Sequence, residues 1–344
     1  MRMTPLSAIL KCISLALLLT APTMADNAQW LTFEGGEGPG KGKHIVLIAA
    51  DQEYRSEQSL PMMARILAER HGFDCTVLFG VNENGLVDPT MPVYPKKGEE
   101  DSFKSHNIPG LEKLENADAL ILATRLLTLP DDQLQYFADY FDSGKPIIAL
   151  RTSNHGFRSK LPYEIDGETV NIKDILGGAF MNHHGVWQQD STRGDIVPEM
   201  KDHPILAGVR DIWGISDVYR TYKEGTGLPE GCTALVYGQP LIGREQGGAD
   251  NPEKEPLPVV WYKNWTTSEG DKSRVLHSTM GSGKDLENPG LRRLIINGVY
   301  WGLGMEEQIT PDSSIEYVGE YEPLGSGFAY EKLGVKPRPV SDYK

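Results

Sequence analysis

Five polar residues follow an apolar segment in the middle of the chain. The run Arg151-Thr152-Ser153-Asn154-His155 comes directly after residues 145–150, KPIIAL. An imidazole moves protons or binds a metal ion, and a guanidinium supplies fixed donors to a developing oxyanion or a keto oxygen. Burying such groups without partners would cost about 1–3 kcal/mol each. The run therefore predicts a ligand-binding turn, with an exposed turn of ordinary turn-forming residues as the open alternative.

Two other apolar segments end in the same way. Residues 44–50 are followed by Asp51, Gln52, Glu53, Tyr54 and Arg55, and residues 118–123 are followed by Thr124 and Arg125. The carboxyl ends of parallel strands meet at one edge of a sheet, where such folds bind ligands. We expect Asp51 and Glu53 as acid–base candidates there, with Tyr54 and Asn154 as substrate-binding candidates.

Histidines outside this turn are further candidates. His183 and His184 are adjacent, so on a strand they point to opposite faces and one of them faces the site. His277 ends a third apolar segment. A zinc ion held by His155, His183, His184 and His277 with Asp or Glu stays open, although the chain has neither an HExxH nor a CxxC motif to favour it. A hydrogen-bonded core histidine is the competing interpretation of each.

Cysteine and serine nucleophiles are disfavoured. No cysteine lies between residues 76 and 231, so the turn after residue 150 cannot carry a thiolate. Ser153 lacks the flanking glycines of a G-x-S-x-G elbow. Cys75 and Cys232 are expected to be free thiols, because two cysteines do not make a disulfide framework.

The elements that position these residues alternate between strand and helix. Strands are expected at 44–50, 75–79, 118–123 and 145–150, with a helix capped by Ser59 and ended by Gly72, and another from Thr128 to Gly144. This order predicts a single α/β domain, residues 44–305, with a doubly wound, mostly parallel, flavodoxin-like sheet. Later strands are expected at 233–237, 257–262 and 274–279, and a helix at 289–302. Residues 26–43 form a leader, 80–116 a long insertion and 306–344 an irregular tail.

The N-terminus has the pattern of a secretory signal peptide. Arg2 and Lys11 precede the apolar run 12–19, and small residues precede a cleavage point after Ala25. The mature protein is therefore expected to be periplasmic or secreted and not membrane-bound. With 48 acidic and 34 basic residues, the net charge of −14 disfavours nucleic acid as a partner. We expect a small-molecule partner; whether the chain forms a homo-oligomer stays open.

Several motifs occur in the order found in one family. These are "LTLPDDQLQYFADYFDSGKPIIAL", "DILGGAFMNHH", "DHPILAGV", "SDVYRT", "PLPVVWYKN" and "RVLHSTMGSGKDLENPGLRRLIINGVYWGLG". In this order they resemble the ThuA-like, or trehalose-utilisation, family over roughly residues 43–305. The resemblance implies a class I glutamine-amidotransferase-like fold and a carbohydrate substrate. It implies hydrolase, lyase or isomerase chemistry on a glycoside or a keto-sugar derivative.

The resemblance also assigns residues. Asp217 and Tyr219 match a family "DE.Y" segment, in which a carboxylate and a ring suit sugar binding, and His277 joins them as a substrate-binding candidate. The chain departs from the family pattern at Arg151, where a histidine is usual, and at Val218, where a glutamate is usual. We expect His155 and one of His183 and His184 to move protons. The alternative is a non-catalytic sugar-binding or scaffolding protein that keeps the fold.

Overall fold

The structure is a computed structural model that describes residues 29–98, 103–223 and 227–344. The expected signal peptide and its cleavage point lie outside these residues. One sheet of ten strands organises the described chain, in the order β1-β3-β2-β4-β5-β14-β13-β12-β9-β10. Among the described residues, no helix is both long and apolar enough to cross a membrane.

Five parallel strands form the centre of this sheet. They are β3 (Asp74–Phe79), β2 (His44–Ala50), β4 (Ala119–Thr124), β5 (Ile147–Leu150) and β14 (Lys272–Ser278). Helices cover both faces, so these strands are buried on both sides and consist of nearly continuous apolar residues. The expected strands at 44–50, 75–79, 118–123 and 145–150 are therefore confirmed within one to two residues.

Antiparallel strands extend the sheet at both edges. Beyond β14 follow β13 (Leu257–Thr266), β12 (Thr233–Leu241), β9 (Ser191–Ile196) and β10 (Ile212–Gly214). At the other edge, β1 (Trp30–Phe33), which lies within the expected leader, pairs with β3. Its four residues are too short a pattern to identify from sequence, and pairing with β3 decides their conformation.

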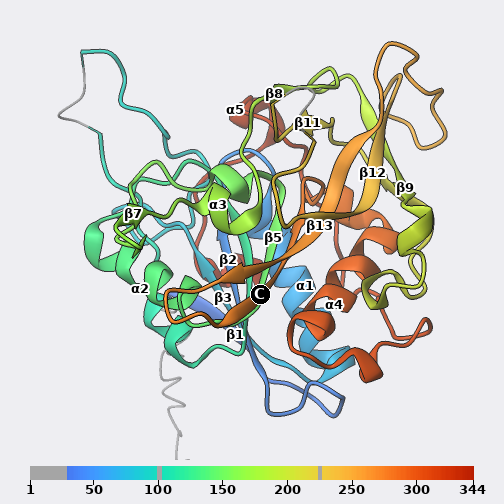
Figure 1. Ribbon diagram of the computed structural model, residues 1–344. Coiled ribbons are helices and arrows are strands. Elements are labelled where there is room, and N and C mark those ends of the chain that lie inside the picture. The colour runs from blue at the N-terminus through green and yellow to red at the C-terminus, as the bar shows by residue number, and fades with distance from the viewer. Residues whose placement is uncertain (1–28, 99–102, 224–226) are drawn as a thin grey trace, which may run out of the picture.

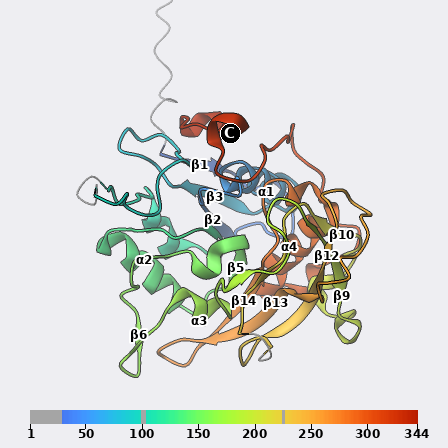
Figure 2. The same cartoon turned by 90° about the horizontal axis from the view of Figure 1, so that it is seen from above.

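Two helices pack on each face of the sheet (Figures 1 and 2). On one face lie α1 (Ser56–His71) and α4 (Pro289–Gly302), and on the other lie α2 (Asp131–Phe141) and α3 (Ile172–Leu176). Each face has its own apolar core, with residues of α1 and α4 in one and residues of α2 and α3 in the other. This arrangement confirms the doubly wound α/β fold, and both expected free thiols, Cys75 and Cys232, are unpaired.

The start of α1 differs from the expectation. Ser59 lies inside the helix, which begins at Ser56 after Arg55 in a left-handed conformation. The carboxylate of Asp51 accepts the backbone N–H of Ser56 at 3.0 Å, so Asp51 supplies the cap that Ser59 was expected to supply. The end at Gly72 is as expected, with φ of 81°.

Short elements and loops gather at the end of the molecule where the parallel strands finish (top of Figure 1). The two-stranded sheet of β8 (Asn182–His183) and β11 (Tyr219–Arg220) lies there, near the short helix α5 (Tyr330–Leu333) of the tail. A separate hairpin joins β6 (Glu164–Ile165) to β7 (Glu168–Thr169). The tail is mostly irregular, as expected, but it is fixed to the body by the backbone pair of Val87 and Arg338.

Candidate functional site

Arg151 is the buried centre of a cluster at the carboxyl end of β5. It is 2% exposed and begins the 3-10 helix η4 (Arg151–His155) with a φ of 49°. Its guanidinium donates to the carbonyl oxygens of Asp217, at 3.1 Å, and Thr279. It also lies 3.2 Å from Oδ1 of Asp217 and donates to the Tyr54 hydroxyl at 3.2 Å. Arg151 is thus occupied within the protein and acts on the site through Asp217.

Asp217 connects Arg151 to an imidazole at the surface. Its Oδ2 accepts from Nδ1 of His183 at 2.8 Å, and the His183 side chain is 43% exposed. Burial opposes ionisation of the carboxyl, but the hydrogen bond from His183 and the charge of Arg151 hold the pKa of Asp217 below its usual range. No described group hydrogen-bonds Nε2 of His183. The result is an oriented imidazole whose free nitrogen is open to a ligand.

His155 is a second oriented imidazole in the same cluster. Its Nδ1 lies 2.8 Å from Oδ1 of Asn154, an oxygen that can only accept, so Nδ1 carries the hydrogen and Nε2 keeps its lone pair. Burial, with the charges of Arg125 and Arg151, lowers the pKa of His155 to about 3. At neutral pH this ring is uncharged, and Nε2 is an acceptor.

Aromatic rings line the surface around the two imidazoles. The Phe180 ring centroid lies 5.4 Å from that of His155 and 5.2 Å from that of His183. Tyr219 lies beneath, 5.6 Å from Phe180, and its hydroxyl donates to the backbone carbonyl of Arg151. Trp187 continues the row, 6.4 Å from His183. Such faces pack against the apolar side of a sugar ring.

Glu53 reaches the rim of this cluster from the end of β2. One carboxylate oxygen accepts from Nε1 of Trp187 at 2.9 Å, and the other lies 3.1 Å from Nε of Arg125. The guanidinium carbon of Arg125 lies 5.0 Å from the ring centre of Phe328, in the tail. Glu53 therefore orients a tryptophan and an arginine at the edge of the site.

Three of the candidate residues lie elsewhere. Asp51 accepts the backbone N–H groups of Glu53, Tyr54 and Ser56, so it holds the loop that presents Glu53. His184, which follows β8, points to the other side: Nε2 lies 2.8 Å from the Glu255 carbonyl and Nδ1 lies 3.2 Å from a nitrogen of Arg220.

His277 is fully buried beneath the site. Its ring packs on that of Trp261 at 4.7 Å, and burial lowers its pKa to about 3. The four histidines considered for zinc therefore do not converge, since His184 contacts a guanidinium and His277 is enclosed. Among the residues that the structure describes, no group of three or more His, Cys, Asp or Glu side chains is placed to hold a metal ion.

The sequence analysis named Tyr54 and Tyr219 but missed the exposed aromatic residues of the site. Phe180, Trp187 and Phe328 are 38%, 37% and 42% exposed, whereas large aromatic residues such as Trp261 are buried. The stretch FMNHHGVW does carry a signal, because two aromatic residues flank the histidine pair within one polar loop. Phe328 carries no such signal, since the tail must fold back before it meets the site.

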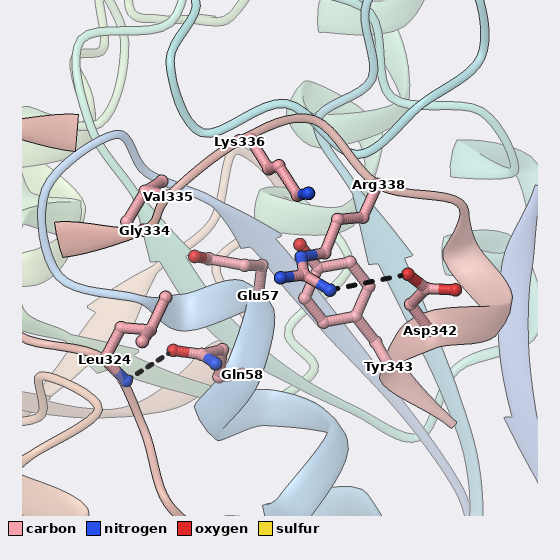
Figure 3. Close-up of a pocket in the computed structure, with 9 residues that line it drawn as sticks. All are labelled: Glu57, Gln58, Leu324, Gly334, Val335, Lys336, Arg338, Asp342 and Tyr343. Carbon is pink, nitrogen blue, oxygen red and sulfur yellow. Dashed lines mark hydrogen bonds and ion pairs between the residues drawn. The ribbon is translucent and has the colours of Figure 1, made fainter. Parts of the chain in front are cut away.

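A separate cavity of about 190 Å³ lies between the start of α1 and the tail (Figure 3). Glu57 lines it from α1, and Arg338, Asp342 and Tyr343 line it from the tail. Glu57 is 4% exposed, and one of its carboxylate oxygens has no hydrogen-bond partner. Burial raises its pKa to about 7. No exposed imidazole or aromatic ring lines this cavity, unlike the cluster around His183.

One family profile agrees with the motif order. A sequence profile of the ThuA family, described as trehalose utilisation, matches residues 99–302. A solved ThuA-like protein from Parabacteroides merdae has 13% identity and a TM-score of 0.44, over 88% of this chain and 99% of that chain. The N-terminal domain of mmIFT52 has 13% identity and a TM-score of 0.37, over 76% of this chain and 97% of that domain.

Cytoplasmic protein STM3548 from Salmonella typhimurium has 10% identity and a TM-score of 0.36, over 75% of this chain and 98% of that chain. No match is found among curated proteins.

Proposed function

The chain belongs to the ThuA family of trehalose-utilisation proteins, and from this premise we propose that it is a carbohydrate-active enzyme whose proton-transfer group is His183. The observation that carries the proposal is the 2.8 Å hydrogen bond between His183 and the buried carboxylate of Asp217. A carboxylate in that position fixes the tautomer of the imidazole and stabilises the imidazolium that forms when Nε2 takes a proton.

Each neighbour of this pair has a definable part in the proposed reaction. Arg151 keeps Asp217 ionised, so that Asp217 accepts the Nδ1 hydrogen throughout. Nε2 of His183 takes a proton from the carbon beside a keto group, and the electron pair forms an enolate. In an isomerisation the proton returns to a carbon of the enolate; in a lyase reaction it passes to the oxygen of the neighbouring C–O bond, which breaks as the C=C bond forms. Nε2 of His155 accepts a hydrogen bond from a sugar hydroxyl, because this ring is neutral. Phe180 packs against the sugar ring between them.

The arrangement favours lyase or isomerase chemistry over glycoside hydrolysis by paired carboxylates. Such hydrolysis uses two carboxyl groups that flank the scissile bond, one to donate a proton and one to attack or activate water. Here Asp217 is bound by His183 and Arg151, and Glu53 is bound by Trp187 and Arg125. Neither carboxylate is free for those roles, whereas an imidazole base is available.

Two adjacent histidines provide the test. The variant H183N keeps a donor near the position of Nδ1 but has no base, so kcat should fall about 10²–10⁴-fold. The matched variant H184N removes the adjacent imidazole, which points away from the site toward Glu255, and should leave kcat within a few-fold. Turnover is followed by NMR on trehalose, other glycosides and their keto derivatives, with and without EDTA, which should have no effect. Equal kcat in H183N and wild-type protein would contradict the proposal.

The second candidate function is sugar binding without turnover. It is favoured by the burial of Arg151, which stands where family members usually carry a histidine and presents no donor to a ligand. Calorimetry separates the two functions, because a binding protein gives saturable heat with trehalose or another glycoside and no product. In that case H183N would weaken binding without any catalytic effect.

We also propose that the protein is secreted or periplasmic, from the pattern of residues 1–25. N-terminal sequencing of native protein is expected to start near Asp26. An intact Met1 in the protein purified from its own compartment would refute secretion.

A further inference from the structure

We infer that Trp187 and Phe328 together form an outer sugar subsite, which binds the ring next to the one that reacts at His183. This inference rests on the proposed function and identifies the substrate as a neutral glycoside of at least two rings. Phe328 lies beyond residues 99–302, the segment that matches the family. The C-terminal tail would therefore determine substrate specificity in this chain.

Exposed rings form a continuous row from Phe180 through His183 and Trp187 to Phe328. Successive centroids are 5.2 Å apart from Phe180 to His183, 6.4 Å from His183 to Trp187 and 6.1 Å from Trp187 to Phe328. Trp187 and Phe328 are 37% and 42% exposed, and their planes differ by 28°. Large apolar side chains gathered at the surface mark a binding surface, and these two stacked rings leave more than a third of each residue open to a ligand.

A carboxylate holds the edge of Trp187, and a guanidinium lies over the face of Phe328. Glu53 accepts the indole N–H of Trp187 and pairs with Arg125, whose guanidinium lies against Phe328. The platform is thus held in place before a ligand binds, which reduces the entropy cost of binding. Because the charges of Glu53 and Arg125 compensate each other, the subsite suits a neutral ligand with hydroxyl groups at its rim.

Two hydrogen bonds anchor the tail at the two residues directly before Phe328. The N–H of Gly327 donates to the Glu53 carbonyl at 2.8 Å, and the Gln188 side chain donates to the Ser326 carbonyl at 2.8 Å. Gly327 has a φ of 121°, and a Cβ there would lie 2.4 Å from Nε2 of Gln188. The positive φ favours glycine at this turn, and a side chain there would also displace the Gln188 amide that anchors Ser326.

Binding of one-ring and two-ring sugars tests the inference. The probes are glucose on one hand, and trehalose, maltose, sucrose and cellobiose on the other. Wild-type protein should bind at least one two-ring sugar more tightly than glucose. F328A and W187A should weaken binding of the two-ring sugar about 10-fold, as expected for the loss of a ring contact. F328W, which keeps an aromatic ring at this position, should bind that sugar as tightly as the wild-type protein. Affinity for glucose should stay unchanged. Y237A, which removes another exposed ring on β12, should change neither affinity.

The outcomes separate this inference from the proposed function. If H183N abolishes turnover while F328A and W187A leave the affinity and KM for every two-ring sugar unchanged, the outer subsite is wrong and the catalytic proposal stands. An equal loss of glucose and two-ring binding in F328A would also overturn the subsite, because it would indicate a general effect on the site. If wild-type protein neither binds nor converts any of these sugars, both proposals fail.

Discussion

Two buried arginines stand at the start of helical segments at the same edge of the sheet, and their guanidinium groups contact different partners. Arg55 precedes α1 with a φ of 64°, and Arg151 begins η4 with a φ of 49°. Their exposed fractions are 0% and 2%. Left-handed backbone is uncommon for a residue with a long side chain, so at both positions the surroundings impose the conformation.

The partners of the two guanidinium groups differ. Arg151 has a carboxylate, two carbonyls and a tyrosine hydroxyl, and through Asp217 it connects to the exposed imidazole of His183. Arg55 donates to the Gln52 carbonyl and lies 3.7 Å from Glu57. Nε has no hydrogen-bond partner in either arginine, but Arg55 also has one terminal nitrogen without a partner. Only Arg151 is therefore connected to the imidazole that we propose as the proton-transfer group, whereas the carboxylate beside Arg55 lines the separate cavity next to the tail.

The first prediction compares R151M with R55M. Loss of Arg151 leaves the ionised Asp217 buried without its cation, which should lower the free energy of unfolding by about 3–5 kcal/mol and abolish turnover. Loss of Arg55 should lower the free energy of unfolding by only about 1–2 kcal/mol, because Glu57 can take up a proton near neutral pH. Urea unfolding at pH 6 measures both, and R151K tests whether charge alone restores stability. Equal losses would mean that the two arginines are equivalent structural residues.

The sequence was sufficient to predict the parallel core, because each of its strands is locally apolar. Residues 44–50 and the helix at 289–302 agree with β2 and α4 at both ends. The strands β1, β9 and β10 were not foreseen. They are short or mixed in polarity, and their conformation depends on pairing with strands distant in sequence.

The site shows the same division between local and distant information. His183 and Asp217 could be chosen separately as chemical candidates, but their hydrogen bond depends on the pairing of β8 with β11, two residues each. The pairing sets His183 opposite Tyr219, two residues beyond Asp217. Phe328 meets the site only because residue 327 bonds to residue 53, a contact that no local pattern encodes.

The last prediction concerns pH and the second arginine. Burial raises the pKa of Glu57 from 4.5 to about 7, with Asp51 adding to the rise and Arg55 opposing it. The folded state therefore binds a proton that the unfolded state has released between these two pH values. Stability should fall as the pH rises through this window, by up to about 3 kcal/mol, and should level off above it.

The variant E57Q should abolish this part of the pH dependence, since an amide does not titrate. Urea midpoints at pH 5, 6, 7 and 8 give the comparison, and E69Q, exposed on the same helix, is the matched control that should follow the wild-type protein. The groups that face Glu57 across the cavity, Arg338 and Tyr343, belong to the tail, so loosening of the tail at high pH should accompany the loss of stability. Parallel curves for E57Q and wild-type protein would show that Glu57 does not titrate in this window and that Arg55 keeps it ionised.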